Sequence, residues 1–131
     1  MAALTVVAEQ DHKNWNDYGG GPDNSHFVGL KQITRANVNQ LLVAWTYPAQ
    51  DRVSYLFNPI IVENVIYVLA RNYSLVALDA ESGKEIWIHE NLAGISNRGI
   101  AYWESKDRDD RRLIFALKSR LLERPICVGP E

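Results

Sequence analysis

Several features that define common protein classes are scarce or absent in this sequence. The single cysteine, Cys127, excludes an internal disulfide and any metal site built from several cysteines. Basic and acidic side chains nearly balance, 14 against 16, so charge gives no indication of binding to nucleic acid or to anionic lipid. No apolar run approaches the roughly 20 residues that a membrane-spanning helix requires. The 131 residues have the size of one domain.

The N-terminus carries a short apolar run from Ala2 to Ala8 with no basic residue before it. A complete signal peptide has a positively charged start and an apolar region of about 7 to 15 residues, so the pattern is incomplete. Residues 1–10 are interpreted either as the remnant of a signal peptide cleaved near Ala8 or as a disordered terminus, and both interpretations stay open.

A hairpin is predicted at residues 60–69. The β-branched, apolar run 60–62 is interrupted by Glu63 and Asn64 and resumes at 65–69. This pattern predicts two antiparallel strands with a two-residue turn, because asparagine tolerates the positive φ that such a turn needs.

Two more strands are predicted in the same sheet, at 75–78 and from residue 85 onward. In the turn between them, Asp79 is expected to accept backbone amides, and Gly83 is expected to take a conformation that a side chain resists. The apolar residues are so dense that neighbouring segments are expected to cover both faces of the sheet.

Three motifs give the sequence a resemblance to a known family. VALDAESGKEIW, which ends at Trp87, resembles the blade repeat of the pyrroloquinoline-quinone (PQQ)-dependent dehydrogenases, the quinoprotein alcohol and glucose dehydrogenases. WNDYGG at 15–20, with the segments 30–38 and 42–47, is similar to the mature N-terminus of these enzymes, and NRGIAYW at 97–103 is similar to the entry of their second blade.

The resemblance covers roughly residues 11–120 and implies an all-β fold. That fold is an incomplete β-propeller of an eight-bladed quinoprotein, with a ring-closing strand at 42–47, one full four-stranded blade and the start of a second. Before the strand, Thr34 is expected to cap a helical turn over 35–40. Three apolar residues of this region are expected to face inward: Val38, Leu41 and Leu42.

The C-terminal part departs from the repeat. Glu104 to Arg112 is predicted to be a solvated hairpin tip, followed by a strand at 113–117. Residues 121–131 lack the Asp and Gly of the repeat turn and contain Pro125, which cannot donate to a strand ladder. They are interpreted as an aberrant tail of a truncated or frameshifted sequence, with a divergent natural ending as the alternative.

Three residues are candidates for contact with the cofactor that the resemblance implies, PQQ. Arg98 carries a guanidinium that suits the planar carboxylates of the quinone, and Gly99 allows close backbone approach. Asn58 stands where many members have a glutamate that contacts the quinone. Arg98 pairing with a nearby acid or a carbonyl at a blade edge is the structural alternative.

The family's reaction would oxidise a sugar or an alcohol at the quinone, with a calcium ion as Lewis acid, and pass electrons to a respiratory quinone or cytochrome in the periplasm or at the periplasmic face of the inner membrane. The catalytic Asp and the calcium ligands come from later blades, so no catalytic or metal-binding residue is predicted in this chain, which is expected to be inactive alone. Leu92 to Gly94 replace the adjacent cysteines of many alcohol-oxidising members, which favours a glucose-type or uncharacterised branch. The alternatives are a non-catalytic propeller scaffold, as in outer-membrane lipoproteins with the same repeat, and a pseudogene product.

Overall fold

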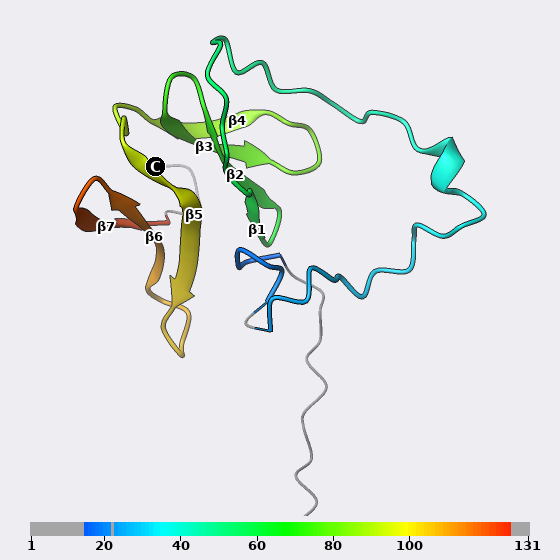
Figure 1. Cartoon of the computed structure of the whole chain (residues 1–131). Coiled ribbons are helices and arrows are strands. Elements are labelled where there is room, and N and C mark those ends of the chain that lie inside the picture. The colour runs from blue at the N-terminus through cyan, green and yellow to red at the C-terminus, as the bar shows by residue number, and fades with distance from the viewer. Residues whose placement is uncertain (1–14, 22, 127–131) are drawn as a thin grey trace, which may run out of the picture.

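The chain, seen here as a computed structural model, forms two antiparallel sheets that follow one another in the sequence (Figure 1). The structure describes residues 15–21 and 23–126, without the side chains of residues 97 and 98. The predicted terminus at 1–10 and the last five residues of the predicted tail lie outside this part. The first sheet has the order β1 (Ile60–Val62), β2 (Val65–Ala70), β3 (Ser74–Asp79), β4 (Glu85–His89). The second has the order β5 (Ile95–Glu104), β6 (Arg111–Leu117), β7 (Arg120–Pro125).

The first hairpin forms as predicted, except for the residue that turns. Val62 pairs with Val65, which leaves a two-residue connection. Glu63 takes the left-handed conformation, with φ of 55°, instead of the predicted Asn64. Asn64 instead bonds to the turn that follows β3. Its side-chain amide donates to Asp79 over 3.1 Å, and its carbonyl accepts from the amide of Ala80 over 2.9 Å.

The turn between β3 and β4 confirms the prediction for Asp79 and Gly83. One carboxylate oxygen of Asp79 accepts from the amide of Ser82 at 2.7 Å and from its hydroxyl at 2.6 Å. The hydroxyl and amide of Ser82 together lower the pKa of Asp79. Gly83 has φ of 70°, and its amide donates to the carbonyl of Asp79 over 2.8 Å. The turn is therefore fixed by its own local hydrogen bonds.

Both faces of the first sheet are covered, as the apolar density predicted. The central strand β3 is buried at every position from Ser74 to Leu78. On one face, side chains of the first sheet such as Tyr67 and Leu75 share a core with Leu113 and Phe115 of the second sheet. On the other face, the N-terminal segment covers a smaller cluster with three residues: Trp45, Tyr47 and Ala49.

The prediction of a strand at 42–47 is wrong for the chain as it stands. These residues pair with no strand in the described part of the chain, and Leu42 is 91% exposed. A strand exists only where a neighbour accepts its hydrogen bonds. Trp45 instead donates from its indole nitrogen to the carbonyl of Ala80 over 3.0 Å, and the Tyr47 hydroxyl donates to Glu85 over 2.6 Å.

The N-terminal segment contains the only helix among the described residues, the 3-10 helix η1 (Val38–Gln40), on an arm that arches away from both sheets (Figure 1). The predicted cap at Thr34 does not form. Instead, the side-chain oxygen of Asn37 accepts hydrogen bonds from the amide and the hydroxyl of Thr34. The predicted inward packing is also wrong: Val38 and Leu41 are 50% and 56% exposed. No described helix is long and apolar enough to cross a membrane.

The second sheet contains the strand predicted at 113–117 and one that was not predicted. The strand β6 begins two residues early, at Arg111, and the hairpin tip before it is largely exposed, as predicted. Residues 120–125, which were largely assigned to the aberrant tail, pair with β6 as β7. Pro125 is the last residue of that strand, opposite Arg112, where the lost donor matters least. The origin of the tail stays a prediction.

Candidate functional site

The site is built at the seam where β1 of the first sheet lies beside β5 of the second. Asn58 precedes β1 by two residues, and Gly99 lies inside β5. A Cβ atom built on Gly99 would lie 3.8 Å from the main-chain oxygen of Asn58. The structure thus brings two of the three predicted cofactor contacts against each other.

Gly99 occupies an irregular part of β5. Its φ is 90°, a conformation that side chains rarely adopt, and the pairing of β5 with β6 shifts register between Ile95 and Ile100. The regular pairing of the two strands is thus interrupted around Gly99. The positive φ is a reason for glycine at this position that the sequence did not indicate, and the predicted close approach of its backbone to a quinone stays a prediction.

The third predicted contact, Arg98, has its backbone in β5 next to Gly99. Its side chain lies outside the described part of the structure, so neither the guanidinium contact with the quinone nor the alternative pairing with an acid is tested.

The N-terminal motif at 15–20 joins the same seam, which sequence reasoning about individual residues missed. The carbonyl of Trp15 accepts from the amide of Ile61 over 2.6 Å and so attaches the motif to β1. The Asn58 side-chain amide points to the carbonyl of Tyr18 at 3.5 Å, and the Tyr18 ring lies 3.7 Å from the Cβ position of Gly99. The sequence did contain a signal for this contact, the WNDYGG motif, but it did not show where the motif lies in space.

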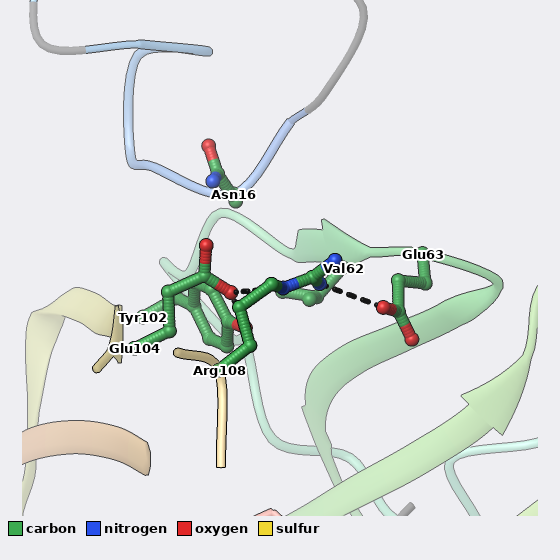
Figure 2. A pocket seen from close by; sticks show the side chains of 6 residues that line it. All are labelled: Asn16, Val62, Glu63, Tyr102, Glu104 and Arg108. Carbon is green, nitrogen blue, oxygen red and sulfur yellow. Dashed lines mark hydrogen bonds and ion pairs between the residues drawn. The ribbon is translucent and has the colours of Figure 1, made fainter. Parts of the chain in front are cut away.

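At the other end of the seam, a cavity of about 290 Å³ lies between the two sheets and the N-terminal motif (Figure 2). The side chain of Arg108 lies between two carboxylates, donating to Glu104 over 3.0 Å and to Glu63 over 2.7 Å. Six residues line this cavity: Asn16, Val62, Glu63, Tyr102, Glu104 and Arg108.

The charged groups of this cavity form hydrogen bonds and ion pairs with one another. The hydroxyl of Tyr102 donates to Glu104 over 2.6 Å, and this bond, with Arg108, lowers the pKa of the Glu104 carboxyl. Burial and the same bond raise the pKa of Tyr102. Both shifts move the pKa values away from neutrality, and the ion pairs of Arg108 with Glu63 and Glu104 link the two sheets.

The residues described at the Asn58 end offer hydrogen-bonding groups to a ligand. The Asn58 amide offers both a donor and an acceptor, and Gly99 exposes backbone without a side chain. A calcium ion needs several oxygen ligands, and among the described residues no three His, Cys, Asp or Glu side chains gather to hold a metal.

The arrangement of the two sheets defines a class of protein. A four-stranded antiparallel sheet is followed by a second antiparallel sheet, and their first strands, β1 and β5, lie side by side. Asn58 lies at Gly99, and Glu63 lies near Glu104, so the two strands run in the same direction. Consecutive sheets related in this way are blades of a β-propeller.

Comparison with known proteins gives the family. Residues 15–124 match the model of the glucose/ethanol/alcohol dehydrogenase β-propeller domain, PQQ, and the chain belongs to this family. It is 33% identical to the quinoprotein glucose dehydrogenase of Escherichia coli over 79% of this chain and 15% of that protein. It is 32% identical to the quinohemoprotein alcohol dehydrogenase ADH-IIG of Pseudomonas putida, over 79% of this chain and 16% of that protein.

A solved structure agrees with the fold. The quinohemoprotein alcohol dehydrogenase of Comamonas testosteroni superimposes with a TM-score of 0.63 at 24% identity, over 81% of this chain and 18% of that one. The fold prediction of an incomplete β-propeller is therefore confirmed. The chain spans about a sixth of the length of the curated relatives it matches.

Proposed function

We propose that this chain supplies the first blades of a PQQ-dependent dehydrogenase that oxidises a sugar or an alcohol. The observation that carries the proposal is the meeting of Asn58 and Gly99, from different sheets, in a chain that belongs to the family. PQQ, when bound, accepts the electrons that leave the substrate.

Each candidate residue has a distinct task toward the quinone. The Asn58 amide donates to a carboxylate or carbonyl oxygen of the ligand, and Gly99, without a side chain, lets the backbone approach it closely. Arg98 supplies the charge, because its planar fork meets a carboxylate with two hydrogen bonds. The chain binds and orients the quinone, and the proton transfer is left to groups outside it.

The remaining parts of the enzyme lie outside this sequence. We propose that a calcium ion and a catalytic Asp come from further blades, that the acceptor is a respiratory quinone or cytochrome, and that the enzyme acts in the periplasm or at the periplasmic face of the inner membrane. The absence of adjacent cysteines before Arg98 favours a glucose-type substrate over a short alcohol.

The proposal is tested by equilibrium dialysis of PQQ against the purified chain. We expect saturable binding that Arg98→Ala weakens about tenfold, the value of one charged hydrogen-bonded contact of about 1.4 kcal/mol. Arg98→Lys is expected to restore little, because an ammonium lacks the fork. Arg35→Ala, an exposed arginine on the arm, is the matched control and should bind as the unaltered chain does.

Dye reduction tests the second half of the proposal. With PQQ, calcium and glucose present, the chain alone is expected to show no turnover above a protein-free control. Turnover would show that this chain carries its own catalytic base. A complete lack of PQQ binding would overturn the quinone site and favour the scaffold function.

A further inference from the structure

The cavity around Glu63, Glu104 and Arg108 is bounded by three separate parts of the chain (Figure 2). Its walls come from the N-terminal motif at Asn16, from the turn after β1, and from the end of β5 with the loop that follows. The side chains of Glu63 and Arg108 are 47% and 54% exposed, so a ligand can reach the cavity from the solvent. The cavity lies at the opposite end of β1 from Asn58, and it is therefore separate from the proposed quinone site.

The charges around this cavity cancel. Glu63 and Glu104 carry the negative charges, and the guanidinium of Arg108 lies between them, at 2.7 Å and 3.0 Å. A second guanidinium, that of Arg111, lies 3.4 Å from Glu63. Because two carboxylates face two guanidiniums, the cavity favours neither an anion nor a cation. A neutral ligand can enter it without leaving a charge unpaired.

Hydrogen-bonding groups remain free on the cavity wall. The Asn16 side chain makes no hydrogen bond within the described residues, so its amide keeps its donors and its acceptor. Tyr102 and Arg108 both donate to the Oε2 atom of Glu104, at 2.6 Å and 3.0 Å, which leaves the Oε1 atom as an acceptor. Figure 2 shows this second oxygen pointing toward the side of the cavity where Asn16 lies. The wall thus offers donors and acceptors together.

The size and polarity of the cavity match a small polyhydroxylated molecule. At about 30 Å³ for each water, 290 Å³ corresponds to about ten waters, and a monosaccharide has a similar number of non-hydrogen atoms. Ligand pockets are usually lined mainly by apolar side chains, whereas Val62 is the one wholly apolar residue among the six that line this cavity. A ligand that replaces waters by its own hydroxyl groups therefore suits it better than an apolar one.

We propose that this cavity binds a neutral monosaccharide, held by hydrogen bonds from the Asn16 amide and to the free oxygen of Glu104. The sugar bridges two blades, because Glu63 lies in the first sheet and Glu104 in the second. The site binds without reacting. This inference goes beyond the proposed function and does not depend on the binding of PQQ.

An NMR titration of the whole chain with D-glucose tests the inference. We expect saturable binding with a Kd of about 1–10 mM, the affinity that a few net hydrogen bonds give. The amide signals that shift are expected in residues 15–20, 62–63 and 102–108. A lack of saturable binding would overturn the inference, and so would shifts confined to the surroundings of Asn58.

Three asparagine variants locate the sugar. Asn16→Ala is expected to weaken glucose binding about 2- to 10-fold, the range of one hydrogen bond. Asn39→Ala, at an exposed asparagine in η1, is the matched control, and Asn58→Ala removes the amide at the other end of the seam; both should bind glucose as the unaltered chain does. An Asn16→Ala variant that binds as tightly as Asn39→Ala would refute the inference. A loss in Asn58→Ala alone would assign the sugar to the quinone end.

The balance of charge gives a second, independent test. Arg108→Gln leaves one negative charge in excess, so protonated glucosamine should gain affinity relative to glucose by about 2- to 5-fold, the range of one exposed ion pair. Arg35→Gln changes the net charge of the chain equally, but it lies on the arm and should leave this ratio unchanged. An unchanged ratio in Arg108→Gln would contradict binding in this cavity.

Circular dichroism of each variant checks that the sheets remain. If Arg108→Gln does not fold, Glu63→Gln takes its place. It leaves one positive charge in excess, so the same experiment with gluconate should show a gain of similar size over glucose. An unchanged ratio would again refute the inference.

The outcomes separate this inference from the proposed function. If the chain binds PQQ and glucose shifts no signal around the cavity, the sugar site is refuted and the quinone site stands. If glucose binds in the cavity and the chain binds no PQQ, the sugar site stands and the proposed function is wrong.

Discussion

Replacing Gly83 by alanine tests how the N-terminal segment is attached to the first blade. A Cβ atom at this position would lie 2.5 Å from two ring atoms of Trp45, and φ of 70° is unfavourable for any side chain. The indole is a rigid ring that also donates to Ala80, so it cannot move aside without losing that hydrogen bond.

The expected loss has two parts. The left-handed conformation costs an alanine about 1–2 kcal/mol. Displacing Trp45 forfeits the hydrogen bond to Ala80, a loss of about 0.5–1.5 kcal/mol, together with part of the packing on the cluster around Val76. We therefore expect Gly83→Ala to lower the free energy of unfolding by about 2–4 kcal/mol in total.

Urea unfolding followed by circular dichroism measures this change, and a double-mutant cycle assigns it. In a Trp45→Ala background, Gly83→Ala is expected to cost only the backbone part, about 1–2 kcal/mol. Gly94→Ala is the control for backbone strain, because its nearest contact is the flexible side chain of Lys118. Equal costs of Gly83→Ala with and without Trp45 would refute the steric account.

Three further predictions concern charge and titration. Glu63→Gln removes an exposed ion pair with Arg108, so it should lower the free energy of unfolding by less than about 1 kcal/mol. A double-mutant cycle with Arg108→Gln should show that the coupling energy between the two residues falls from low to high salt. An unchanged coupling energy in high salt would contradict this. The hydroxyl of Tyr55, with backbone amides, lowers the pKa of Asp51, so the stability it contributes is present above the ordinary value near 3.8 and lost as the pH falls below it; Asp51→Asn should flatten this acid slope in thermal melts, and an unchanged slope would refute the role. Burial raises the pKa of Tyr67 to about 12, so its contribution is present below pH 10 and lost as the pH rises through about 12; Tyr67→Phe should reduce the alkaline slope of the same melts, and a titration of Tyr67 near 10 in the folded chain would contradict the burial.

The elements that sequence predicted well are those that depend on neighbours along the chain. The hairpin at 60–70 and the turn from Asp79 to Gly83 are closed by residues a few positions apart, so their residue types alone indicate the structure. The family resemblance was available for the same reason, because the blade motif is one local unit. Pro125 was judged on its missing donor, which does not matter at the last position of β7.

Tertiary structure decided what depends on partners distant in the sequence. Residues 42–47 have the composition of a strand, yet they pair with no strand in the described part of the chain, and only Trp45 and Tyr47 among them pack on the first sheet. A strand needs a hydrogen-bonding neighbour that composition does not supply. The positive φ lies on Glu63, whereas the Asn64 side chain bonds Asp79, 15 residues further along the chain.

The same distinction applies to the candidate site. Sequence marked Asn58 and Gly99 as separate candidates, through their places in family motifs. Only the folding of β5 beside β1, with the N-terminal motif bonded to Ile61, brings them together with Tyr18. Residue identity therefore determined the chemistry that the site offers, whereas the packing of two sheets determined which residues share it, because such contacts are set by the shape of the whole chain.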